Sequence, residues 1–229
     1  MPSDLASLAR RCLAHGLRLR GGFHPEAGDG VTALPDGRVP ATLILVGNVG
    51  SSLWASFSGS PEAQDGAPHP LNRWTQRVVS QIAAEAGAAA LFPFGGPPYL
   101  PFQRWAMRAE PVAASPLGIL IHPDYGLWHA YRGALAFADR LALPPRVERP
   151  RPCDSCADRP CLSACPVGAF TARGYDVPAC IGHIAGPAGA ACLDGCLARR
   201  ACPVGADFAY DAAQGHFHMA AFLAANRAR

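Results

Sequence analysis

The chain contains no lysine, because all 20 of its basic residues are arginine. This absence excludes a Walker-type phosphate lysine and Schiff-base chemistry. Charge is scarce: charged residues make up 16% of the chain, and the net charge of +3 is too small to predict a nucleic-acid partner. The sequence also lacks Gly-x-Ser-x-Gly, His-Glu-x-x-His and a convincing pair of acids, so nothing in it indicates a hydrolase.

Long apolar stretches are missing as well. No run of 18 uncharged apolar residues occurs, so we predict no membrane-spanning helix. The first twenty residues carry Asp4 and four arginines without the apolar segment of a signal peptide, so we expect a cytoplasmic location. Hydrophobic residues nevertheless make up 50% of the 229 residues, which is enough for one large domain or two small ones.

Apolar residues in the first half follow helical spacing in some segments and form short runs bounded by Pro or Gly in others. Ser3 is a candidate N-cap for the first of these segments. The predicted elements are helices at 3–19, 71–86 and 217–223, strands at 41–46, 89–94 and 117–121, and either a strand or a helix at 131–138. This mixture predicts an α+β fold, with helices packed on a sheet in the first half.

A proline-rich segment divides the chain. Residues 144–152 contain four prolines and four charged residues, a composition that disfavours both a helix and a central strand. We therefore predict an α/β domain at 1–143, a linker at 144–152 and a small cysteine-rich domain at 153–229.

Cysteine is the most informative residue. Of nine cysteines, Cys12 lies on the apolar face of the first predicted helix and is interpreted as a small buried hydrophobe. The remaining eight follow the linker: Cys153, Cys156, Cys161, Cys165, Cys180, Cys192, Cys196 and Cys202. Eight thiols so close in sequence indicate disulfides, zinc or iron–sulfur clusters, and the expected reducing compartment disfavours disulfides.

The spacing of these cysteines is typical of iron–sulfur ligands. The runs are Cys153-x2-Cys156-x4-Cys161-x3-Cys165-Pro166 and Cys192-x3-Cys196-x5-Cys202-Pro203, with Cys180 between them. The pentapeptide Cys-Pro-Val-Gly-Ala occurs at Cys165 and again at Cys202, which indicates a duplicated half-site. We expect each proline to open a helix whose N-terminus faces an anionic cluster.

In two-cluster ferredoxins the cysteine before the proline ligates the other cluster. Applied here, this rule predicts two sets of four ligands for two [4Fe–4S] clusters. The first cysteine set is Cys153, Cys156, Cys161 and Cys202, and the second cysteine set is Cys165, Cys180, Cys192 and Cys196. The first run has two more residues before its third cysteine than the usual pattern.

Structural zinc is the alternative. Two zinc sites with four thiolates each would favour paired Cys-x2-Cys knuckles, and only Cys153 and Cys156 form one. Zinc also gives no reason for the repeated Cys-Pro. A zinc-stabilised interaction module remains one of the functions that the sequence allows.

Residues 122–133 read His-Pro-Asp-Tyr-Gly-Leu-Trp-His-Ala-Tyr-Arg-Gly. This stretch resembles the His-Pro-x-x-Gly-x-Trp-x-x-x-Arg-Gly segment of the cobalamin-processing decyanase family. The order of an α/β region followed by two [4Fe–4S] sites resembles the epoxyqueuosine reductase and reductive dehalogenase group. That resemblance implies a nitroreductase-like first domain, a bacterial-ferredoxin-like second domain and a bound corrinoid.

On the same resemblance, five residues would line or support the corrinoid site: His122, Tyr125, Trp128, His129 and Arg132. The sequence departs from other corrinoid proteins in having no Asp-x-His-x-x-Gly motif, so it predicts no histidine ligand to cobalt of that type. No residue is assigned a catalytic role.

The function expected from the sequence is therefore an iron–sulfur oxidoreductase. It would pass single electrons through two clusters to a cofactor, a corrinoid, on the first domain. Its partner would be an electron donor such as a flavodoxin or a ferredoxin reductase. The alternatives are a ferredoxin-type carrier with no substrate of its own and the zinc-stabilised module.

Overall fold

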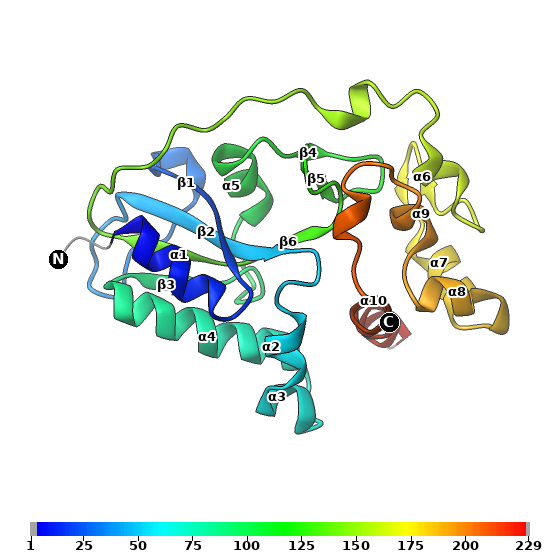
Figure 1. Cartoon of the computed structure of the whole chain (residues 1–229), viewed down its shortest axis with the longest axis horizontal. Helices are drawn as coiled ribbons and strands as arrows, with labels where there is room; N and C mark the ends of the chain where they lie inside the picture. The colour runs from blue at the N-terminus through cyan, green and yellow to red at the C-terminus, as the bar shows by residue number, and fades with distance from the viewer. Residues whose placement is uncertain (1–3, 228–229) are drawn as a thin grey trace. The chain divides into compact units, whose positions relative to one another are not determined.

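A computed structural model of the chain describes residues 4–227 (Figure 1). Helices and a four-stranded sheet are both present, which confirms the predicted α+β class. The chain divides into two compact units, each made from two segments of sequence. Unit 1 comprises Met1–Pro111 and His129–Glu148, and unit 2 comprises Val112–Trp128 and Arg149–Arg229.

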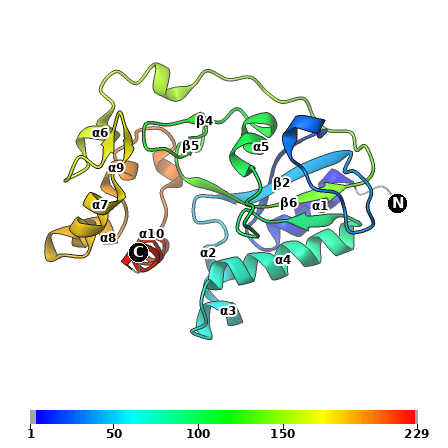
Figure 2. The same ribbon diagram turned by 180° about the vertical axis from the view of Figure 1, so that it is seen from behind.

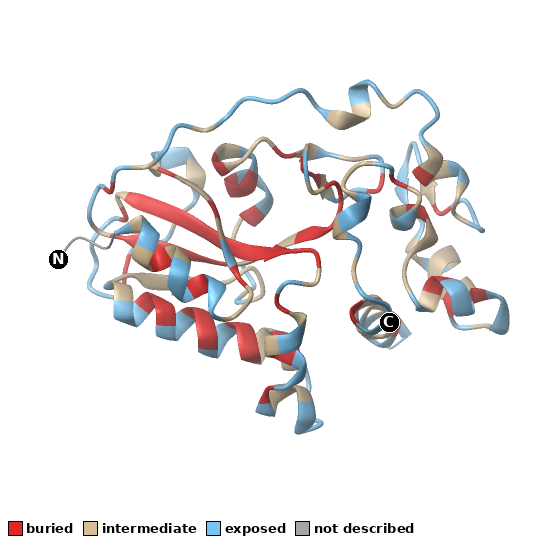
Figure 3. Ribbon diagram, viewed as in Figure 1, coloured by how far each residue is buried: buried red, intermediate tan, exposed pale blue. Residues whose placement is uncertain are grey.

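Unit 1 is built on an antiparallel sheet. In sheet order its strands are β1 (Arg18–Phe23), β2 (Thr42–Val49), β6 (His129–Phe137) and β3 (Ala89–Leu91). All eight residues of β2 are buried (Figure 3). An antiparallel strand with one wet face would alternate buried and exposed residues, so this continuous burial means that both faces of the sheet are covered at β2.

Three helices cover the sheet of unit 1. Helix α1 (Leu5–Leu13) contacts β1, α4 (Pro70–Ala86) contacts β3 and β6, and α5 (Phe102–Ala109) contacts β1 and β2. Figures 1 and 2 both show α4 running along the sheet. The short helices α2 (Trp54–Ser58) and α3 (Pro61–Gln64) precede α4, and a 3-10 turn occupies Ala27–Asp29.

Helix α4 confirms the prediction at 71–86. Its apolar side chains at Leu71, Trp74, Val78 and Ile82 are buried, as their helical spacing requires. Pro70 occupies the first turn, where its missing N–H costs nothing. The helix ends at Gly87, whose φ of +68° is the left-handed conformation typical of a C-cap.

The first predicted helix is too long. Helix α1 ends at Leu13, because the chain turns at Gly16, which has a φ of +68° and lies so close to Ser52 that a Cβ atom would be 1.8 Å from its carbonyl oxygen. The proposed cap Ser3 lies outside the described residues. Asp4 caps the helix, and its side chain accepts a hydrogen bond from the Ala6 N–H at 3.1 Å.

The strand predictions differ in how well they hold. The prediction at 41–46 is confirmed by β2, and the ambiguous segment 131–138 is a strand, β6. The predictions at 89–94 and 117–121 are too long, because β3 ends at Leu91 and only β5 (Leu120–Ile121) forms in the second segment. Gly118, with a φ of +75°, places a turn inside that apolar run.

Unit 2 consists of short elements. Its helices are α6 (Pro160–Ser163), α7 (Val177–Ile184), α8 (Ala190–Leu193), α9 (Leu197–Arg200) and α10 (Ala212–Arg227). Two small hairpins pair β4 (Ala113–Ala114) with β5 and β7 (Phe170–Thr171) with β8 (Gly174–Tyr175), and 3-10 turns occupy Pro152–Asp154, Pro187–Gly189 and Ala206–Phe208. Helix α10 contains the helix predicted at 217–223.

The division of the chain differs from the predicted boundaries. Residues Val112–Trp128 belong to unit 2, although they precede the proline-rich segment by some distance. The reason is local: Leu117, Ile121 and Leu127 share a buried core with Cys161 and Cys202. Unit 1 in turn extends to Glu148, within the segment that the sequence marks as a linker.

Within residues 4–227, every helix is too short or too polar to cross a membrane.

Candidate metal centres

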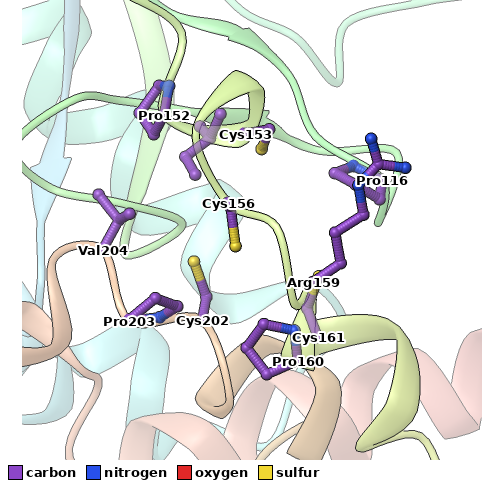
Figure 4. A pocket seen from close by; sticks show the side chains of 11 residues that line it. Pro116, Pro152, Cys153, Cys156, Arg159, Pro160, Cys161, Cys202, Pro203 and Val204 are labelled. Atoms are coloured by element: carbon purple, nitrogen blue, oxygen red, sulfur yellow. The ribbon is translucent and has the colours of Figure 1, made fainter.

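The first cysteine set lines one pocket in unit 2 (Figure 4). The pocket contains about 330 Å³ of space free of protein atoms, part of it open to solvent. Its walls are Cys153, Cys156, Cys161, Cys202, Pro116, Ile121, Pro152, Arg159, Pro160, Pro203 and Val204. Figure 4 shows the sulfur atoms of Cys156 and Cys202 pointing toward each other. Three cysteines from one run and the last cysteine of the other therefore face a common space.

The backbone around Cys202 is positioned by two glycines. A Cβ atom on Gly126 would lie 1.8 Å from the carbonyl oxygen of Val204, and one on Gly205 would lie 2.3 Å from the carbonyl carbon of Tyr125. Both glycines have positive φ, at 55° and 68°. The turn after Cys202 therefore packs backbone to backbone against the 122–128 segment, a contact that only glycine permits.

Arg199 strengthens this contact. Its Nε and NH2 groups donate to the carbonyl oxygen of Leu127, at 3.1 and 2.5 Å. Its guanidinium lies 4.6 Å from the ring centre of Trp128 and 4.4 Å from that of Tyr210. A planar cation between two rings is well placed for cation–π attraction, so Arg199 fixes α9, and hence the cysteines at its two ends, to the 122–128 segment.

The prediction that each Cys-Pro opens a helix is wrong. The chain forms a turn after Cys165 and another after Cys202, with Gly168 and Gly205 in the left-handed conformation in both. The amide groups still reach the sulfurs: the Ala169 N–H lies 3.3 Å from the Cys165 Sγ. Burial raises the pKa of Cys202, and a hydrogen bond from the Val204 N–H to its sulfur partly opposes this increase. A turn thus supplies the N–H donors that we expected from a helix.

Within the first cysteine set, burial and neighbouring thiols raise the pKa values of the cysteines. Burial is the largest cause that raises the pKa of Cys153, and the neighbouring thiols of Cys202, Cys161 and Cys156 raise it further. The pKa of Cys161 is also raised, first by burial and then by Cys202 and Cys156. Several thiolates in so small a space repel one another, so they can ionise together only if a cation compensates their charge.

The second cysteine set gathers around α8 and α9. Burial raises the pKa of Cys192, and the thiols of Cys180 and Cys165 raise it further. Burial also raises the pKa of Cys196, with added contributions from Cys180 and Cys192. Backbone N–H groups of Ala198 and Arg199 bond the Cys196 sulfur and partly oppose this increase. The thiols that act on each cysteine thus come from its own predicted set.

The two sets interleave along the chain. Cys196 is the N-cap of α9, and Cys202 follows that helix after one residue. Cys161 lies in α6, and Cys165 follows that helix after one residue. Both helices therefore join a cysteine of one set to a cysteine of the other. Among the described residues, no three His, Cys, Asp or Glu side chains converge as the ligands of a single metal ion must.

Tyr175 is a neighbour of the second cysteine set that the sequence did not reveal. Its hydroxyl forms a hydrogen bond with the Cys180 thiol, and burial raises the pKa of this phenol. Its ring stacks on Phe170 at 4.7 Å and on Phe222 at 6.1 Å between centres. No spacing signal marks Tyr175, because its aromatic partners come from β7 and from α10.

The structure divides the five residues of the corrinoid prediction between the units. His122, Tyr125 and Trp128 belong to unit 2, whereas His129 and Arg132 lie on β6 in unit 1. His122 is 6% exposed and its Nδ1 accepts hydrogen bonds from the amides of Asp124 and Tyr125. Trp128, 5% exposed, contacts Arg199. These two side chains are used in the packing of unit 2.

In unit 1, His129 belongs to a buried polar network. Arg20, 1% exposed, donates two hydrogen bonds to the carboxylate of Glu110, at 2.9 and 2.7 Å, and lies 3.3 Å from His129 Nδ1. The Tyr131 hydroxyl donates to the same carboxylate at 2.6 Å. Arg132, half-buried, lies within 3.4 Å of polar atoms of Asn72 and Thr75. No local sequence pattern reveals this network, because Arg20, Glu110 and His129 are far apart along the chain.

Comparison with known proteins gives little for this chain. No protein-family profile matches it, and no curated protein matches it. One solved structure with some similarity is a crystal structure of epoxyqueuosine reductase with an epoxyqueuosine-modified tRNA stem loop. The two chains are 13% identical, the match covers 91% of this chain and 68% of that one, and the TM-score is 0.46. A likeness at this level assigns neither a fold family nor an activity.

Proposed function

We propose that this chain is an iron–sulfur protein that transfers single electrons through two [4Fe–4S] clusters. The first cysteine set would hold one cluster and the second cysteine set the other. The observation that carries this proposal is the pocket in which Cys153, Cys156 and Cys161 face Cys202. Chain elements far apart in sequence bring four soft thiolate donors to one space, and such donors select iron–sulfur clusters or zinc.

The surroundings of the sulfurs fit an anionic cluster. Amide groups bond the sulfurs of Cys165, Cys196 and Cys202, and hydrogen bonds to sulfur are a main means by which a protein adjusts a cluster. The raised pKa values of the cysteines mean that the metal must displace protons when it binds. When bound, the clusters supply one-electron oxidation and reduction.

The electron balance requires two partners. A reduced one-electron donor of the flavodoxin or ferredoxin type loses one electron, and an acceptor gains it. The side chains of unit 2 hold the sulfurs in place and keep part of each site away from water. No described residue is assigned a role in bond making or breaking.

For the acceptor we propose a corrinoid, as the resemblance of residues 122–133 implies. Arg132, on β6 of unit 1, is half-buried and retains surface for contact with such a ligand. The buried His122, Trp128 and His129 would support their neighbours instead. A bound corrinoid would supply the cobalt that accepts the electron. A carrier with no acceptor of its own is the competing function.

Metal analysis tests the proposal. Protein purified without oxygen should be brown and contain about eight iron atoms and about eight acid-labile sulfides per chain, four of each per cluster. Zinc without sulfide would overturn it in favour of the interaction module. Anaerobic titration with cobalamin should change the corrinoid spectrum and yield Co(II) on reduction, whereas an unchanged spectrum would favour the carrier.

Ligand variants test the assignment of cysteines. Cys165→Ser should lose about half of the iron, because it removes one ligand of one cluster. Cys12→Ser is the matched control: this cysteine is fully buried in unit 1 and belongs to neither set, so its iron content should equal that of the unaltered protein. Equal iron in both variants would show that Cys165 is not a ligand.

A further inference from the structure

Arg159 has a strained backbone in the loop between Cys156 and Cys161. Its φ and ψ are 41° and 54°, in the left-handed region that residues other than glycine rarely adopt. It also precedes Pro160, and a residue before proline is normally pushed to an extended conformation. This conformation costs free energy, and such strain is common where a side chain has a function.

The side chain of Arg159 lines the pocket of the first cysteine set. Figure 4 shows the Arg159 side chain extending along the pocket, with its guanidinium at the rim next to Pro116. Of the eleven residues that line the pocket, all of them described, Arg159 alone is basic. In the described part of the chain, no acidic side chain lies within ion-pairing distance of it, so its positive charge is not neutralised by a carboxylate.

We propose that Arg159 raises the reduction potential of the cluster held by the first cysteine set. This inference rests on the proposed function. One electron added to a cluster makes it more negative by one charge, and a nearby cation stabilises this reduced state more than the oxidised state. Because the guanidinium is exposed, salt should screen much of the effect.

Charge and strain can be separated with variants of Arg159 itself. Arg159→Gln removes the charge but keeps a Cβ atom, so the strain of the left-handed backbone conformation remains. Arg159→Lys retains the charge. Arg159→Gly removes both the charge and the strain, since glycine adopts this φ freely. If the glutamine variant fails to assemble its clusters, the glycine variant still tests the loss of charge.

His69 provides a matched control for strain alone. Its φ and ψ are 54° and 46°, and it also precedes a proline, Pro70, at the start of a helix. It belongs to unit 1, whereas both cysteine sets belong to unit 2. His69→Gly therefore relieves the same kind of strain without changing the charge in the cysteine pocket.

The measurement is a redox titration of the full-length protein, loaded with clusters anaerobically and followed by electron paramagnetic resonance. In Arg159→Gln and Arg159→Gly, one cluster should become harder to reduce while the potential of the other stays constant. Arg159→Lys and His69→Gly should keep both potentials. The difference between Arg159→Gln and the unaltered protein should shrink at about 1 M salt, where the screening length is about 3 Å.

Three results would overturn the proposal: unchanged potentials in both uncharged variants, equal shifts of both clusters, or an Arg159→Lys variant that behaves like Arg159→Gln. Failure of the proposed function looks different, because the unaltered protein would then contain no iron and sulfide to titrate. In that case the role assigned to Arg159 falls with it.

Discussion

At the scale of single residues, the nine cysteines behave as two kinds. Eight lie in unit 2 beside other thiols or backbone amides. Cys12 instead packs on the inner side of α1, is 0% exposed and has no metal-site neighbour among the described residues. The sequence distinguished them correctly in one respect: Cys12 shares the apolar face of an amphipathic helix and is buried, as predicted.

The pH dependence of stability should expose this difference. Burial raises the pKa of Cys12 from 9.0 to about 11. The folded protein therefore retains this proton while the unfolded chain loses it, so the stabilising effect is present below pH 9 and is lost between about pH 9 and pH 11. By pH 10.5 this loss should be about 2 kcal/mol of the unfolding free energy of unit 1.

Urea unfolding at pH 8 and pH 10.5 measures this loss. In Cys12→Ala the decrease in stability between the two pH values should be smaller by about that 2 kcal/mol, because the ionisable group is gone. Equal decreases in the two proteins would show that folding does not raise the pKa of Cys12.

At the scale of elements, α9 depends on a side chain for its position. It spans four residues, Leu197–Arg200, which is too short to be stable on its own. Arg199 fixes it through two hydrogen bonds to Leu127 and through the rings of Trp128 and Tyr210. Since Cys196 and Cys202 flank α9, the position of this helix matters to both cysteine sets.

Arg199→Leu should therefore destabilise unit 2 by about 2 kcal/mol, the scale of a charged hydrogen bond with its cation–π contacts. Urea unfolding followed by circular dichroism measures the change. Arg200→Leu is the matched control, because Arg200 is the exposed neighbour in the same helix. Similar losses in both variants would mean that Arg199 is an ordinary surface residue.

Long helices and strands were easier to predict from the sequence than short ones. Helix α4 has seventeen residues with a clear apolar stripe, and its bounds were predicted almost to the residue. Strand β6 could not be told from a helix, because residues 133–137 are all buried and show no alternation. Helices α7, α8 and α9 were not predicted at all, since helices this short carry too little periodicity.

The candidate site also has features that the sequence predicted and features that it did not. The cysteines were visible from spacing, and the structure gathers the first set around one pocket. Residues 122–128 were expected in the first domain, yet Gly126 packs on the turn after Cys202. Such a contact between distant segments leaves no local pattern. The same holds for Arg159, whose backbone conformation cannot be read from its residue type.

At the scale of the whole molecule, the two units differ in what stabilises them. Unit 1 has a sheet whose strand β2 is buried on both faces, and a long amphipathic helix. The cores of unit 2 are small, and cysteines make up much of them: Cys161 and Cys202 in one, Cys192 in the other. Metal bound to such cysteines contributes directly to folding.

If the chain holds the proposed clusters, removal of iron should affect the units unequally. Anaerobic treatment with a chelator should unfold much of unit 2 and leave the sheet of unit 1 intact. In a thermal melt, the temperature at which unit 2 unfolds should therefore decrease. Hydrogen exchange measured by mass spectrometry can assign the loss to peptides from residues 149–227. Equal protection of these peptides before and after chelation would contradict the prediction.

The interleaving of the two cysteine sets has a consequence for biosynthesis. In the proposed assignment, Cys202 completes the ligands that begin with Cys153, and Cys165 joins cysteines that follow it. A chain still emerging from the ribosome thus offers three sulfurs of the first site and must wait for the fourth. On this assignment, the first cluster would gain its full set of ligands only after Cys202 is translated, and the second only after Cys196.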